Sequence, residues 1–126
     1  MTLYINTASK DEMIIALRDG KQSFEKKIKT AHDQSEKLLP AIEAHLKAKQ
    51  AKLGDLKKIV VVSRGGSFTS LRIGVITANA LAYALKIPVE AAEKTGKKNK
   101  KFGRYSIVEP DYDREPNIGA PKKAIL

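Results

Sequence analysis

The residues best placed to do chemistry lie in one short turn, Ser63-Arg64-Gly65-Gly66-Ser67. Free backbone N–H groups at the start of a helix attract anions, and Arg64 adds positive charge, so this turn can hold a phosphate. It is not a P-loop, because no Lys-Ser or Lys-Thr pair follows at the required spacing. The alternative is a plain turn between a strand and a helix, and we favour that interpretation.

Two histidines and three acidic residues are the other side chains that could bind a metal ion or take part in catalysis. His32 and His45 are thirteen residues apart and would not share a face of one helix, so we predict no metal site there. Asp111, Asp113 and Glu115 alternate in a segment expected to be extended, where they can bind a cation, although nearby basic residues favour a solvated tail. Since no nucleophile, general base and orienting acid combine, we predict no catalytic residue and no cofactor.

Positive charge is the strongest signal in the composition. The chain has 24 Lys and Arg against 14 Asp and Glu, a formal net charge of +10, which fits a polyanionic partner, most simply RNA. The excess gathers at Lys94, Lys97, Lys98, Lys100, Lys101 and Arg104. We predict that Lys97, Lys98, Lys100 and Lys101 make a weak nucleic-acid contact; a solvated loop is the alternative.

Length and composition limit the class of protein. A chain of 126 residues forms one domain with a real core. It has no Cys, which excludes disulfides and thiolate sites. No signal peptide is visible in residues 1–6, and the apolar region after Phe68 contains Arg72 and Asn79, so it predicts a buried helix and not a membrane span. We expect a cytoplasmic protein without a membrane partner.

The elements that would position the turn are a buried strand and a long helix. Residues 58–62 form a continuous β-branched run, typical of a central strand covered on both faces. Ser67 or Thr69 can cap a helix that continues to about residue 85. This helix carries two apolar stripes on different sides: Leu71, Val75, Ala78, Ala82 and Leu85, and Ile73, Ile76, Ala80, Tyr83 and Ala84. One stripe faces the sheet, and the other requires a second helix or a partner.

Three strands and a helix precede this unit. Strands are expected at 3–5, 13–17 and 22–29, with Asp19-Gly20 as a hairpin turn and the third strand at an edge. A helix is expected over 32–52, with Gly54 just after its end and Pro40 bending or breaking it around 36–39.

The last third is less regular. A short strand is expected at 87–89, a basic loop at 93–104, and a final strand at 105–108 that opens an extended C-terminal arm, 105–126. The order β-β-β-α-β-α-β predicts an α/β fold with a mixed sheet and two main helices, in the ribonuclease H-like arrangement of an actin-like ATPase lobe. Residues 1–92 would form that lobe, and the whole chain one domain.

Four sequence motifs occur in order along the chain: Asn6-Thr7-Ala8, His32 with Leu38-Leu39-Pro40, Asp55-Leu56, and Arg64-Gly65-Gly66-Ser67-Phe68-Thr69-Ser70-Leu71-Arg72-Ile73-Gly74. Together they resemble the N-terminal lobe of the TsaB (YeaZ) family of tRNA threonylcarbamoyladenosine biosynthesis proteins. The resemblance covers roughly residues 3–89, in a shortened, one-lobe form. Asn6 stands where active actin-like enzymes have an acid that helps to hold magnesium, Arg64 and Gly65 replace Gly-Pro, and Ser70 replaces Gly.

The resemblance implies a non-catalytic scaffold that binds TsaD, with TsaE in a larger complex, or a second copy of itself. Its two helices would supply the interface. The predicted contact residues are Leu38, Leu39, Ile42, Leu46, Phe68, Leu71, Arg72, Val75, Ile76 and Asn79. Two alternatives stay open: a residual nucleotide-binding lobe that uses Asn6, Thr7 and Gly65-Gly66, and a basic RNA-binding module.

Overall fold

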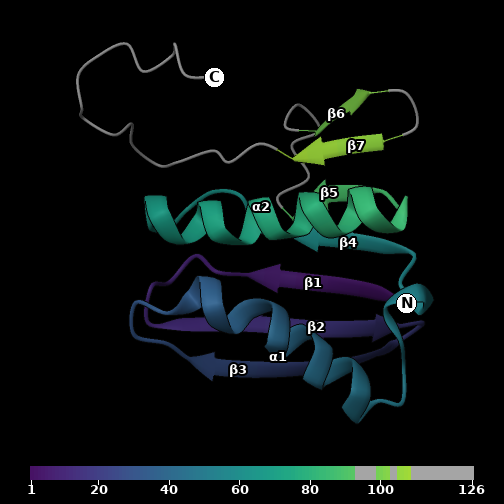
Figure 1. Ribbon diagram of the computed structural model, residues 1–126, viewed down its shortest axis with the longest axis horizontal. Helices are drawn as coiled ribbons and strands as arrows, with labels where there is room; N and C mark the ends of the chain where they lie inside the picture. Colours follow the sequence, from purple (N-terminus) through teal and green to yellow (C-terminus); the bar gives the residue numbers. More distant parts are fainter. Residues whose placement is uncertain (93–98, 103–104, 109–126) are drawn as a thin grey trace.

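A five-stranded mixed sheet forms the centre of the molecule. The computed structural model describes residues 1–92, 99–102 and 105–108. The strands are β1 (Thr2–Asn6), β2 (Glu12–Asp19), β3 (Gln22–Lys29), β4 (Lys58–Val61) and β5 (Val89–Ala91), in the order β3-β2-β1-β4-β5 (Figure 1). β1 to β3 form an antiparallel meander, whereas β4 pairs parallel to both β1 and β5.

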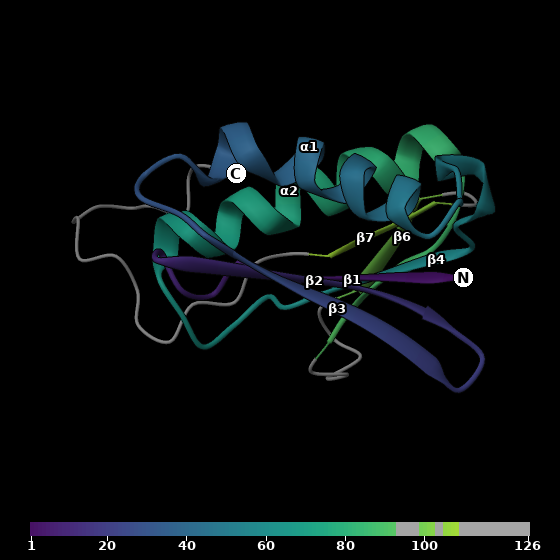
Figure 2. The same cartoon turned by 90° about the horizontal axis from the view of Figure 1, so that it is seen from below.

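Both long helices cover the same face of this sheet (Figure 2). α1 (Gln34–Ala48) packs on β2, and α2 (Phe68–Leu85) packs on β1, β4 and β5 and against α1. The alternation of each strand sends every second side chain toward the helices, so Leu3 and Ile5 of β1 are fully buried. The prediction that residues 58–62 form a strand covered on both faces is therefore wrong: burial alternates along β4, with Ile59 and Val61 buried and Lys58 and Val60 half-buried.

The local turns follow the residue types. Gly20 closes the β2–β3 hairpin with a φ of 66°, which a glycine adopts without a Cβ clash. Ser67 caps α2 by accepting a hydrogen bond from the backbone N–H of Ser70 at 3.4 Å, as predicted for an N-cap serine.

Both helices end in a Schellman motif with a non-glycine residue in the left-handed region. In α1 the N–H of Ala51 donates to Leu46 O and that of Gln50 to Lys47 O, and Gln50 has a φ of 56°. In α2 the corresponding left-handed residue is Lys86, with a φ of 59°. These bonds satisfy carbonyls that the helix leaves free.

Some predicted boundaries are wrong. α1 begins at Gln34, not at residue 32, and ends at Ala48; Gly54 lies in a separate 3-10 turn, Leu53–Asp55. Pro40 does not break α1. It is exposed, so its missing N–H leaves a carbonyl that water can reach instead of an unpaired buried group.

The expected basic loop contains a strand. β6 (Asn99–Phe102) pairs antiparallel with β7 (Tyr105–Val108) in a separate two-stranded sheet, and β7 lies beside α2 and β5 (Figure 1). The strand expected at 87–89 occurs two residues later as β5, because the N–H of Ile87 is used by the end of α2 and donates to Ala82 O. The expected arm after residue 108 lies outside the described residues.

Candidate functional site

The outer face of α2 is the clearest candidate site. Its inner residues Leu71, Val75, Ala78 and Ala82 are all at most 1% exposed, whereas Phe68, Ile76 and Tyr83 are exposed at 38%, 57% and 66%. The exposed residues recur at about helical spacing and therefore lie along one side of the helix.

An arginine on α2 and an exposed leucine on α1 accompany this apolar stripe. The guanidinium carbon of Arg72 lies 5.8 Å from the centre of the Phe68 ring, which places a cation among the apolar side chains. Leu39 on the neighbouring α1 is 42% exposed. We call Leu39, Phe68, Arg72, Ile76 and Tyr83 the helix-face patch. Large exposed apolar side chains with an arginine are typical of protein contacts.

The structure divides the predicted interface residues into two groups. Five of them hold the helices onto the sheet and are at most 3% exposed: Leu38, Ile42, Leu46, Leu71 and Val75. Their side chains are therefore not available as contacts in this fold. Leu39, Phe68, Arg72 and Ile76 are exposed, and Asn79 is half-buried. Tyr83 was not among the predicted contact residues, but it is 66% exposed, and its position seven residues after Ile76 places it on the same face.

The polar residues beside the glycine turn are used for internal packing. Thr7 is fully buried, and its hydroxyl donates to Ser70 O at 2.5 Å. The Oδ1 of Asn6 accepts from the N–H of Ala8 at 3.0 Å, and the N–H of Ser67 donates to Ala8 O at 2.9 Å. A Cβ on Gly66 would lie 2.5 Å from the same carbonyl oxygen. The connection after β1 thus packs directly against the turn that was considered as a phosphate site and interpreted as a plain turn between a strand and a helix.

The histidines have structural positions. The Nε2 of His45 lies 2.8 Å from Phe24 O and so joins α1 to β3, whereas His32 is exposed with a φ of 66°. Within the described residues no three His, Cys, Asp or Glu side chains gather as metal ligands would.

The carboxylate of Asp33 at the start of α1 has a lowered pKa. The main cause is a hydrogen bond from the backbone N–H of Ala31, and the ammonium group of Lys37 lowers the pKa further.

A cavity of about 300 Å³ lies between the first turns of the two helices and Lys10. Helix N-termini attract anions, but Ser67 already caps α2 internally. Of the predicted nucleic-acid contacts, Lys100 and Lys101 lie in β6, and Lys97 and Lys98 lie outside the described residues.

α2 also meets the length and composition of a membrane span, with 18 residues and a mean hydropathy of 1.3, and it is the one described helix that does. Its buried inner face against the sheet agrees with the predicted core helix.

The sheet and helices define an α/β protein with a mixed five-stranded sheet, an arrangement consistent with an actin-like fold. A solved structure of YeaZ from Pseudomonas aeruginosa superimposes with a TM-score of 0.67 at 24% identity, over 71% of this chain and 42% of that one. A second structure, of an uncharacterised protein similar to peptidase YeaZ from the same organism, superimposes with a TM-score of 0.67 at 21% identity. This match covers 78% of this chain and 50% of that one. These likenesses support the fold.

The sequence comparisons identify the family. The model of the family TsaD, tRNA N6-adenosine threonylcarbamoyltransferase, matches residues 27–92, more than half of the chain, and the chain belongs to this family. Within it the chain is TsaB-like, since 59 residues are 41% identical to the tRNA threonylcarbamoyladenosine biosynthesis protein TsaB of Bacillus subtilis, over 47% of this chain and 26% of that protein. The chain spans half or less of the length of the relatives that it matches.

Proposed function

We propose that this chain is a non-catalytic scaffold of the tRNA threonylcarbamoyladenosine (t6A) modification machinery, and that it binds a TsaD-like protein through the helix-face patch. A TsaE-like protein would join the larger complex, and a second copy would occupy the patch when the TsaD-like protein is absent. The cytoplasm is the expected compartment. Family membership supports the pathway, and the order β3-β2-β1-β4-β5 supports the finer proposal of a ribonuclease H-like topology.

The observation that carries this proposal is the two-sided character of α2. The inner stripe of this helix is fully covered by the sheet, yet Ile76 and Tyr83 are 57% and 66% exposed on its outer side. Covering large side chains of this kind is favourable by about 1.5–3 kcal/mol for each fully buried residue. A partner that presents its own apolar helices would supply that cover.

The engagement of Thr7 favours the scaffold over a nucleotide-binding lobe. The threonine hydroxyl that the nucleotide hypothesis requires is fully buried and bonded to Ser70 O. We therefore expect ATP with magnesium to leave the melting temperature unchanged. Stabilisation that grows with ATP concentration would favour the nucleotide hypothesis.

The test of the scaffold uses two exposed positions and a matched control. Ile76→Glu and Tyr83→Glu each place a carboxylate in the patch, and Gln22→Glu adds the same charge at an exposed position of β3. Val75→Glu is uninformative because Val75 is 1% exposed and a buried charge would unfold the chain.

The measurements are pull-down of the TsaD-like protein from the same organism and mass by light scattering, with circular dichroism to verify folding. A hot-spot loss of about 2 kcal/mol weakens binding about 30-fold, so we expect both patch variants to lose the complex and the control to keep it. Equal binding by all three variants would refute the proposed interface.

A further inference from the structure

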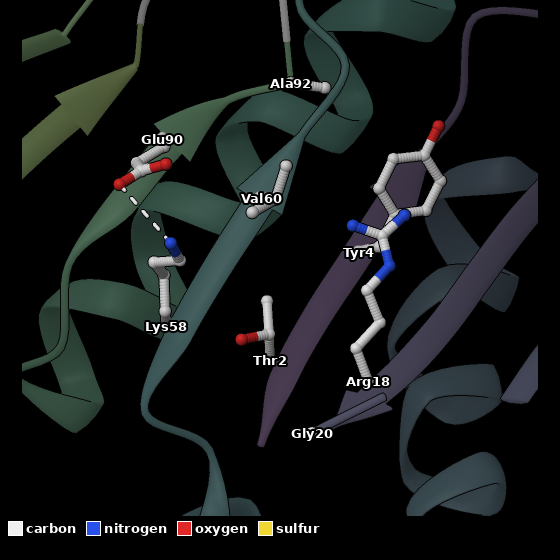
Figure 3. A pocket seen from close by; sticks show the side chains of 8 residues that line it. All are labelled: Thr2, Tyr4, Arg18, Gly20, Lys58, Val60, Glu90 and Ala92. Atoms are coloured by element: carbon white, nitrogen blue, oxygen red, sulfur yellow. Dashed lines mark ion pairs between the residues drawn. The ribbon is translucent and has the colours of Figure 1, made fainter. Parts of the chain in front are cut away.

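The face of the sheet opposite the helices is hollowed into a groove. It has a cavity volume of about 530 Å³, and no described helix covers it (Figure 2). The residues that line it, which we call the sheet-face groove, are Thr2, Tyr4, Arg18, Gly20, Lys58, Val60, Glu90 and Ala92 (Figure 3). It is distinct from the helix-face patch, which lies on the other side of the molecule.

The two walls of the groove differ in charge. On one side the guanidinium carbon of Arg18 lies 4.7 Å from the centre of the Tyr4 ring, and on the other the ammonium of Lys58 lies 3.5 Å from a carboxylate oxygen of Glu90 (Figure 3). Glu90 partly neutralises Lys58. Arg18 has no carboxylate within ion-pair distance among the described residues, so the groove carries a net positive charge beside an aromatic ring.

The strands beneath the groove are of the kind that is normally covered. β1, β4 and β5 are paired in parallel, and parallel strands usually have both faces buried. Tyr4 and Val60 are half-buried on this face. A ligand that suits this groove is therefore an extended peptide segment that carries carboxylates and an aromatic ring.

The sequence of this chain contains such a segment at 109–116, Glu-Pro-Asp-Tyr-Asp-Arg-Glu-Pro. The segment lies outside the described residues. Its four carboxylates and one arginine give a formal charge of −3, and Tyr112 stands between two aspartates. Prolines favour an extended backbone on each side.

The segment starts close enough to the sheet-face groove to reach it. β7 ends at Val108 and lies beside β5, and Glu90 of β5 forms a wall of the groove. The four residues from Val108 to Tyr112 span up to about 14 Å when extended, which is about three strand spacings.

We propose that segment 109–116 binds in the sheet-face groove, with Tyr112 over its floor and the aspartates facing Arg18 and Lys58. The segment would complete the sheet by covering its second face. The proposal does not depend on the identity of the partner at the helix-face patch.

Disulfide trapping tests the proposal, because the chain has no cysteine and any engineered pair is unambiguous. The test pair is Val60→Cys with Tyr112→Cys, and the control pair is Ala44→Cys, exposed on α1, with Tyr112→Cys. The full chain is oxidised at low concentration, and monomeric disulfide is quantified by mass and free-thiol titration. We expect at least about tenfold more intramolecular disulfide for the test pair, the ratio that 1.4 kcal/mol of preferential binding produces.

Charge reversal supplies an independent readout. Arg18→Glu, at an exposed position, should reduce trapping, and Asp111→Arg with Asp113→Arg in the same chain should restore it. Equal trapping by both pairs would overturn the proposal, and so would disulfides formed only between two copies, which would assign the groove to a second chain.

Discussion

The close approach of α2 to the side chain of Thr7 gives a quantitative prediction at Gly74. This glycine lies in the middle of α2, where an added Cβ would meet Thr7 Oγ1 at 2.5 Å, Cγ2 at 3.3 Å and Cβ at 3.4 Å. Thr7 is fully buried, and its hydroxyl bonds to Ser70 O. Its side chain therefore has neither space nor a spare rotamer into which it can withdraw.

Two opposing effects decide the outcome of Gly74→Ala. Alanine is favoured over glycine in a helix interior by about 1 kcal/mol, whereas forcing a methyl group into a packed site costs about 1–3 kcal/mol. We expect the clash to dominate, with a net loss of up to about 2 kcal/mol in the free energy of unfolding. Thr7→Ala removes Oγ1 and Cγ2, the two atoms closest to the added Cβ. In that background Gly74→Ala should therefore raise the free energy of unfolding by up to about 1 kcal/mol.

Urea unfolding followed by circular dichroism checks this with the wild type, both single variants and the double variant. The coupling energy should be about 1–3 kcal/mol. Thr7→Ser keeps Oγ1 and should leave Gly74→Ala destabilising, which separates the clash from the loss of the methyl group. The prediction fails if the effects of Thr7→Ala and Gly74→Ala on the free energy of unfolding are additive to within about 0.5 kcal/mol. In that case Thr7 would not be the residue that excludes a side chain at position 74.

Two further outcomes concern the core and the basic segment. Leu38 and Leu39 are neighbours in α1 but are 1% and 42% exposed, so Leu38→Ala should cost about 2–5 kcal/mol and Leu39→Ala within about 0.5 kcal/mol in urea unfolding; similar costs would contradict the assigned face of α1. Replacing Lys97, Lys98, Lys100 and Lys101 by serine should weaken tRNA binding and flatten its salt dependence, by about 0.7 in the log–log slope for each single-strand phosphate that the protein no longer neutralises. Fluorescence anisotropy from low to high salt measures this, and a slope near zero for the wild type would exclude electrostatic binding of tRNA.

The parts of the fold that depend on local chemistry were predictable from the sequence. Asp19-Gly20 located the hairpin, the third strand matches Gln22–Lys29, and Ser67 caps the second long helix. In each case a short-range rule decides the conformation, because a glycine accepts positive φ and a serine satisfies a free helical N–H.

The parts that depend on long-range packing were not. Gly54 was expected just after the end of α1, but the left-handed residue there is Gln50, and the hydrogen bonds to Leu46 O and Lys47 O offset the strain of its conformation. The apolar stripes of α1 and α2 were recognised, but periodicity does not indicate which stripe faces the sheet. Five predicted contact residues therefore proved to be core, and Tyr83 was assigned to the second stripe without being chosen as a contact.

The central strand β1 links the two faces of the molecule through its register. Leu3 and Ile5 point into the core beneath the helices, while Thr2 and Tyr4 line the groove on the other side. A slip of one residue would exchange these sets, placing polar side chains in the core and aliphatic ones in the groove. Antiparallel pairing to β2 and parallel pairing to β4 fix the register from both edges, so any change that loosened β1 would alter the helix side and the groove side together.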